Sequence, residues 1–195
     1  MKNMKKYTLL IASLFLLGGC AASQTVRQLE TQNAQGVFQV VKDADGQPSA
    51  GYGDLKIALN LKTRNPGTFL VDTTGYGTER YKLLIGINGQ TETVAGVMTP
   101  ESGEYKGSKD PEAGNGVRYL FAKTLRLPVG EHRLVLALPG DKVLSEHVVK
   151  IKHGVNALNL QPVYGRKSSY RMIGFYGATT YFEGVRSLAV AAPVA

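Results

Sequence analysis

The sequence predicts a mainly β protein built around a single antiparallel β-sandwich. Apolar residues recur at every second position in several segments, which is the pattern of half-buried strands. Turn-forming residues return about every ten residues, as in sandwiches and barrels. No helical repeat of apolar residues is longer than about two turns before residue 184. With 195 residues, 43% of them hydrophobic, the chain has enough apolar material for one core.

The first nineteen residues have the three parts of a secretory signal peptide. Residues 1–6 include three lysines, an apolar run extends from Tyr7 to Leu17, and Gly18 and Gly19 follow. A bilayer-spanning helix needs about 20 apolar residues, and this run is shorter. We therefore expect residues 1–19 to be a signal peptide rather than a transmembrane anchor.

The residues Leu17-Gly18-Gly19-Cys20 resemble the lipobox of bacterial lipoproteins, and Cys20 is the only cysteine in the chain. The resemblance implies cleavage before Cys20 and a diacylglyceryl thioether on its sulfur. It implies a protein anchored by lipid in the bacterial envelope, because two or more acyl chains hold stably to a membrane. By analogy with enteric bacteria, Ala21 favours the outer membrane, facing the periplasm or the cell surface. The alternatives are an ordinary signal peptide with an incidental cysteine, or a small buried cysteine of the core.

Between the lipid and the folded part, residues 20–36 are polar, rich in glutamine and without periodicity. We expect them to form a lipid-anchored tether. The alternative is an extra first strand or a short helix at Val26–Glu30. The β-sandwich domain is then expected over residues 37–185, and residues 186–195 are expected to form a C-terminal tail. The alternative for Leu188–Ala195 is a last strand.

The first half of the domain shows alternation interrupted by turn signals. Leu55, Ile57, Leu59 and Leu61 are apolar at every second position, with Lys56 and Asn60 among the residues between them. Asn65-Pro66-Gly67 breaks the pattern. Asn88-Gly89 separates two β-like runs and predicts a hairpin, since both residues must adopt positive φ. The strands expected here are Val37–Lys42, Leu55–Leu61, Leu83–Ile87 and Gln90–Met98.

The second half begins with a polar loop from Thr99 to Gly116, which is long for a compact domain. Turns are then expected at Pro128-Val129-Gly130, at Pro139-Gly140-Asp141 and at His153-Gly154. The strands between them are Val117–Leu127, His132–Leu138, Val143–Lys152 and Val155–Val163. Leu83, Ile85, Ile87, Leu134, Leu136 and Leu138 are expected to face one core.

The segment from Thr124 to Tyr164 resembles the second half of PEGA-type and related modules. It reads LRLPVGEHRLVL, then PGD, then VVKIKHGVNALNLQP, although the Pro-Glu-Gly-Ala motif itself is absent. The resemblance implies an immunoglobulin-like or carbohydrate-binding-like sandwich. It implies almost nothing about a ligand, because such folds carry many functions.

The charge distribution does not indicate a nucleic-acid partner, and the motifs do not indicate an enzyme. The formal net charge is +8, but the basic residues are scattered rather than gathered in a stripe, so we expect no nucleic-acid partner. One cysteine excludes a disulfide framework and multi-cysteine metal sites. His132 and His147 are expected on adjacent strands and could share a metal, but no third ligand is evident. We therefore expect no cofactor, no metal and no catalytic residues.

Two loops are candidates for a partner surface. Tyr76 lies between glycines within Asp72–Arg80, and Tyr105 is the only aromatic residue of Thr99–Gly116. Each loop is expected to present its ring to solvent on a polar, flexible tip. If both loops lie at one end of the sandwich, that end is expected to face a partner. The sequence thus favours a non-catalytic envelope protein that binds another envelope protein or a glycan, or that acts structurally. The alternative function is a glycan-binding module that uses exposed tyrosines. The alternative for the two loops is that they are only solvated connections.

Overall fold

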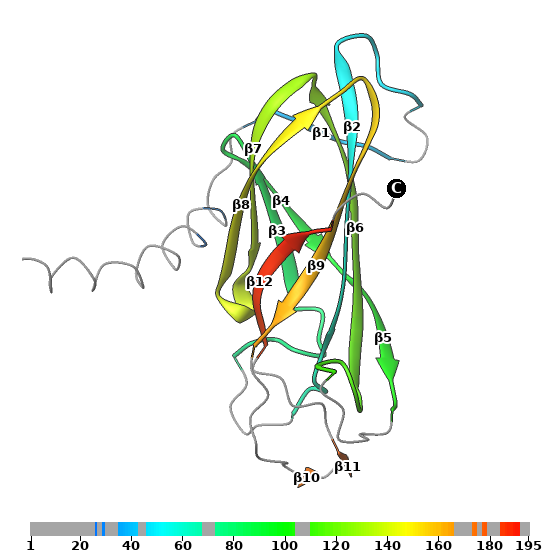
Figure 1. Ribbon diagram of the computed structural model, residues 1–195, viewed down its shortest axis with the longest axis vertical. Helices are drawn as coiled ribbons and strands as arrows, with labels where there is room; N and C mark the ends of the chain where they lie inside the picture. The colour runs from blue at the N-terminus through cyan, green and yellow to red at the C-terminus, as the bar shows by residue number, and fades with distance from the viewer. Residues whose placement is uncertain are drawn as a thin grey trace, which may run out of the picture.

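Strands make up most of the chain that the computed structural model describes, and they form two sheets packed against each other (Figure 1). The predicted mainly β sandwich is therefore confirmed. The described residues are 26, 29, 35–42, 46–67, 73–103, 110–165, 173–174, 177–178 and 184–191.

One sheet, called sheet I, has β2 at its centre. β2 pairs antiparallel with β6 and parallel with β9, and β12 pairs with β9 at the far edge. β1 and β5 both pair with β6 on its other side. The strands of sheet I are β1 (Gln39–Val40), β2 (Tyr52–Thr63), β5 (Val97–Glu101), β6 (Gly116–Pro128), β9 (Gly154–Tyr164) and β12 (Val185–Val190).

The facing sheet, sheet II, is antiparallel throughout, in the order β4-β3-β7-β8. Its strands are β3 (Lys82–Ile87), β4 (Gln90–Ala95), β7 (Gly130–Leu138) and β8 (Val143–Ile151), and a 3₁₀ turn η1 (Pro139–Asp141) joins β7 to β8. The short strands β10 (Ile173–Gly174) and β11 (Gly177–Ala178) pair with each other.

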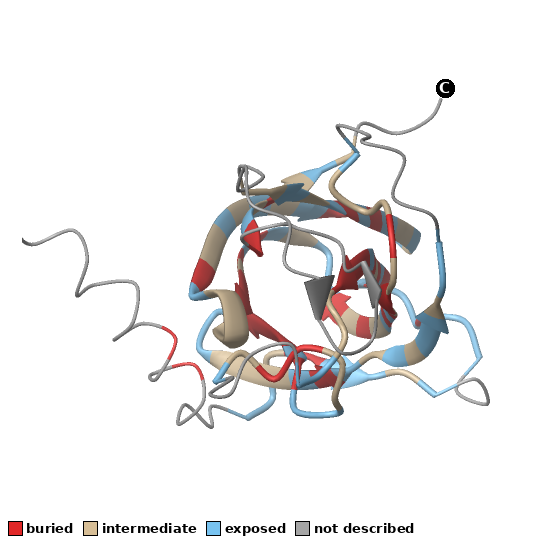
Figure 2. Ribbon diagram, turned by 90° about the horizontal axis from the view of Figure 1, so that it is seen from below, coloured by how far each residue is buried: buried red, intermediate tan, exposed pale blue. Residues whose placement is uncertain are grey.

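The core lies between the sheets and contains the alternating apolar residues. Burial in Figure 2 follows this pattern, with red residues recurring along the strands. Tyr119 and Phe121 of β6 stack within this core with their ring centroids 5.7 Å apart. The six residues expected to face one core are all buried in it: Leu83, Ile85, Ile87, Leu134, Leu136 and Leu138.

The Asn88-Gly89 turn joins β3 to β4 as predicted, with φ angles of 46° and 90°. The single return strand expected over Gln90–Met98 is instead two strands, because the chain leaves sheet II at Gly96 and joins sheet I as β5. A Cβ at Gly96 would lie 2.9 Å from Phe121 Cε1. The crossing therefore requires a residue without a side chain.

The sequence predicts a C-terminal tail over residues 186–195, but residues 186–190 belong to β12. Val185 and Leu188 are buried in the core, and β12 pairs with β9 from Val185 to Val190. The register shifts between Val185 and Ser187. This irregularity breaks the period of two, so the sequence pattern alone did not distinguish a last strand from a tail. Residues 192–195 lie outside the described part.

The connections gather at two opposite ends of the sandwich. β2 and β5 end, and β3 and β6 begin, at the lower end in Figure 1, where η1 also lies. We call this end the loop pole: residues 64–67, 73–81, 102–103, 110–115 and 139–142. The two loops singled out in the sequence, Asp72–Arg80 and Thr99–Gly116, therefore approach the same end. The tight turns after β3, β6 and β8 lie at the other end.

Before β1, Val26 and Leu29 are helical and buried, and they pack with Leu84 and Ala137 of sheet II. At these two positions the short-helix alternative is therefore correct, and the free tether is not. Among the described residues, no helix has both the length and the apolar character needed to cross a bilayer.

Leu136 tests the core most directly, since its side chain is fully buried on β7. We expect Leu136→Ala to lower the free energy of unfolding by about 2–5 kcal/mol through lost transfer energy and a residual cavity. Val148→Ala, at an exposed site on neighbouring β8, is the control. Urea unfolding of both variants checks this, and equal stabilities would contradict the packing.

Candidate functional site

Asp141 lies at the centre of a buried polar cluster at the loop pole. Its carboxylate accepts a hydrogen bond from Tyr76 Oη and one from Tyr81 Oη, the latter at 2.5 Å. The backbone N–H of Val185 donates to the same carboxylate at 3.0 Å. One side chain thereby joins the loop after β2, the start of β3 and the start of β12.

Burial dominates the electrostatics of this cluster. It raises the pKa of the Asp141 carboxyl, although the three donors oppose the rise by stabilising the carboxylate. Burial, followed by the nearby Asp141 charge, raises the pKa of Tyr81 well above its ordinary value. Tyr81 therefore stays a proton donor to Asp141, and the cluster is suited to hold segments together.

Tyr76 does not present its ring to solvent, so the expected exposed tyrosine is wrong at this position. Only 4% of Tyr76 is exposed; its ring packs edge-on against Tyr81, and the Arg64 guanidinium lies 4.5 Å above it. The reason lies in the flanking Gly77, with φ of 69°, where a Cβ would be 2.3 Å from Pro66 Cδ. That glycine permits close packing that turns the ring inward, rather than a flexible tip.

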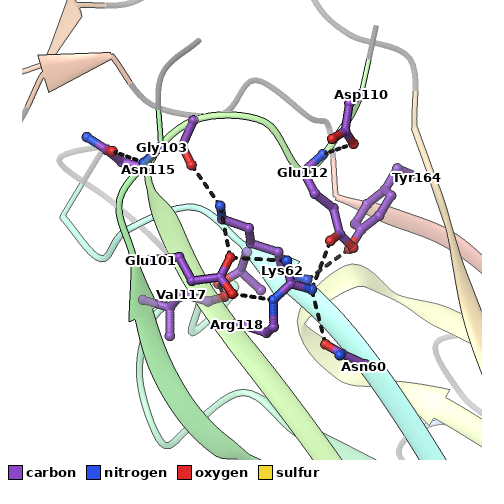
Figure 3. A network of polar contacts seen from close by, with 12 residues as sticks. Asn60, Lys62, Glu101, Gly103, Asp110, Glu112, Asn115, Val117, Arg118 and Tyr164 are labelled. Carbon is purple, nitrogen blue, oxygen red and sulfur yellow. Dashed lines mark hydrogen bonds and ion pairs between the residues drawn. The ribbon is translucent and has the colours of Figure 1, made fainter. Parts of the chain in front are cut away.

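A second network surrounds Lys62 on the outer face of sheet I (Figure 3). The Lys62 side chain is only 5% exposed, and its Nζ donates to the carbonyl of Gly114 at 2.7 Å. Nζ also lies 3.2 Å from a carboxylate oxygen of Glu101 on β5. Gly116 permits this close approach, since a Cβ there would lie 2.3 Å from the Thr63 carbonyl oxygen and 2.9 Å from Lys62 Cε.

Arg118 of β6 lies directly opposite Lys62 in the strand register and bridges two carboxylates. Its Nε lies 2.5 Å from Glu101, and its Nη1 lies 2.9 Å from Glu112 of the long loop. The hydrogen bond from Arg118 is the main cause that lowers the pKa of Glu101. Two cations therefore face two carboxylates, and their charges balance.

Tyr164, at the end of β9, closes this second network. Its hydroxyl donates to Glu112 at 2.5 Å and accepts the backbone N–H of Lys62 at 2.9 Å. Backbone pairing between β2 and β9 ends at Leu59 and Leu160, so the hydroxyl replaces a strand partner beyond that point. Burial and Glu112 raise the pKa of Tyr164, which keeps it protonated as a donor.

The end of β2 connects the two networks. Lys62 belongs to the second network, and the Arg64 guanidinium covers the Tyr76 ring of the first. Between them, Thr63 Oγ1 accepts the backbone N–H of Gly77 at 3.2 Å. The two loops of the pole are thus fixed to one strand end.

The histidine pair predicted from the sequence lies on neighbouring strands, with His147 opposite Leu134 as expected. His132 is within hydrogen-bonding distance of the Asn88 amide and the Pro128 carbonyl, at the end away from the loop pole. Within the described ranges, histidine, cysteine, aspartate and glutamate side chains do not gather in groups of three or more that could hold a metal ion.

Two of the sequence-predicted site residues, Cys20 and Tyr105, lie outside the described residues. The chain on either side of the Tyr105 segment is anchored: the Gly103 N–H donates to Asn115 Oδ1 at 3.0 Å, and Glu112 pairs with Arg118. Sequence reasoning missed the network residues Lys62, Glu101, Glu112, Arg118, Asp141 and Tyr164.

Comparison with known proteins gave no match to a protein-family model, a curated protein or a solved structure.

The stabilising effect of the second network can be tested by comparing the same substitution at Lys62 and at a second lysine on the same face of β2. Lys62→Met leaves the Glu101 carboxylate without one partner and the Gly114 carbonyl without its donor, so we expect a loss of about 1–3 kcal/mol in stability. Lys56→Met, at an exposed site on the same face, should change stability by less than about 0.5 kcal/mol. Equal effects in urea unfolding would show that the network does not stabilise the pole.

Proposed function

We propose that this protein is a lipid-anchored component of the bacterial envelope that binds another envelope protein, without catalysis, through its loop pole. The observation that carries the proposal is the pair of polar networks around Asp141 and Lys62, which fix the bases of two long loops at one end of the sandwich. The lipobox-like residues ending at Cys20 support the lipid anchor.

The structure of the pole suits recognition by a preorganised surface. Residues 104–109, which include Tyr105, join Gly103 to Asp110, and both ends of this segment are tied by hydrogen bonds of the loop. Binding is less costly when the loop bases are already ordered, since less conformational entropy remains to be lost. The burial of Tyr76 removes one of the two rings that a glycan surface would have used, which favours a protein partner.

The test exchanges residues 104–109 for a Gly-Ser linker of the same length. The exchange leaves Glu112 and Gly114 in place, because Arg118 and Lys62 bind them. We expect recovery of the partner from intact envelopes, by photo-crosslinking and pull-down, to fall while the protein stays folded. Val129→Ser, an exposed site at the opposite end, is the control and should recover the partner normally. A Cys20→Ala arm should lose acylation and leave an uncleaved precursor or a soluble product.

Unchanged recovery with the exchanged loop would refute the partner surface. A wild-type mature N-terminus elsewhere than Cys20, with no added lipid mass, would refute the anchor.

A further inference from the structure

The outer face of sheet II carries an apolar site that a segment near the N-terminus occupies. Val26 and Leu29 are 8% and 5% exposed, and they form a cluster with Leu84 and Ala137 that is separate from the core between the sheets. Partly buried Val135 and Leu144 complete the cluster. The two short red segments of the N-terminal trace in Figure 2 are the buried residues of this segment.

Gly86 of β3 provides the space for Leu29. A Cβ at Gly86 would lie 2.6 Å from Leu29 Cδ2, which is closer than real Cβ contacts come. Glycine inside a strand weakens it and often marks a close approach of another segment. The contact therefore accounts for a glycine that strand formation alone does not favour.

This contact limits how far the sandwich can stand from a lipid on Cys20. Six residue steps separate Cys20 from Val26, so an extended chain spans at most about 22 Å between them. A tether free as far as residue 36 would span up to about 58 Å. Packing at Val26 and Leu29 thus removes most of the reach that the sequence had suggested.

We propose that Val26 and Leu29 hold the outer face of sheet II toward the lipid surface and leave the outer face of sheet I turned away from it. The proposal rests on the proposed lipid anchor at Cys20. Two packed sheets are about 10 Å apart, and side chains extend the sandwich further on each side. A chain of about 22 Å that starts on sheet II cannot pass around the sandwich and also reach a membrane lying against sheet I.

The test uses the lipidated full-length mature protein in vesicles of phosphatidylethanolamine and phosphatidylglycerol that contain a nitroxide-headgroup lipid. Cys20 is the only cysteine, so acylation leaves an introduced cysteine as the one free thiol for a fluorophore. Val148→Cys places it on the outer face of sheet II and Leu120→Cys on that of sheet I, both at exposed sites. We expect quenching to be at least about threefold stronger at position 148, given the separation of the sheets.

Gly86→Leu should displace Leu29 and bring the two quenching values close together. Lys150→Leu adds the same side chain at an exposed site of this sheet and should leave the threefold difference intact. If Gly86→Leu does not fold, Leu29→Asp tests the same contact from outside the core.

Lipid on Cys20 is confirmed by mass. If quenching is then equal at positions 120 and 148 in the otherwise unchanged protein, the proposed orientation is wrong and the lipid anchor is not contradicted. Absence of lipid on Cys20 would overturn both. If quenching still differs between positions 148 and 120 in Gly86→Leu and in Leu29→Asp, the contact between Leu29 and Gly86 does not set the orientation.

Discussion

The pairing of β2 on both sides is the constraint on which the rest of the structure depends. β6 pairs with it along its whole length, from Tyr52 to Thr63, but β9 pairs with it only as far as Leu59. The last residues of β2 therefore run beyond the parallel ladder. Their backbone and side-chain groups must find other partners, because buried polar groups without hydrogen bonds are costly.

Those partners come from the ends of β5 and β9 and from the long loop, and this explains the order of the loop pole. The backbone N–H of Lys62 finds the hydroxyl of Tyr164, and its ammonium finds Gly114 and Glu101. A buried ammonium is tolerated only when it is paired and hydrogen-bonded, so the loop that supplies the Gly114 carbonyl is held in place. On the other face of the strand, Thr63 holds the loop of Tyr76 through the N–H of Gly77.

The sequence predicted what depends on local pattern and missed what depends on distant contacts. The period of two located β2, β3 and β7, and Asn88-Gly89 located the hairpin, because each signal lies within a few residues. In the network around Lys62, the Lys62–Gly114 and Tyr164–Glu112 hydrogen bonds each join residues 52 positions apart, and contacts of this kind leave no periodic signal.

Glycines gave the most misleading signals. Gly75 and Gly77 suggested a flexible loop tip, but Gly77 packs against Pro66 and the intervening tyrosine turns into the core. Gly96 and Gly86 also mark close approaches, of Phe121 and Leu29 respectively. A glycine in a sequence shows that a side chain is absent, but only the fold shows whether freedom or crowding is the reason.

Native-state amide hydrogen exchange measures most directly whether the polar networks hold the loop pole rigid. The amides to follow are those of Lys62, Gly77 and Val185, since each donates to a side chain of the networks. If the networks fix the pole, these amides should open only with free energies close to that of global unfolding, like the hydrogen-bonded amides of β7. Exchange through local opening at a free energy near zero, as at fraying termini, would contradict this account.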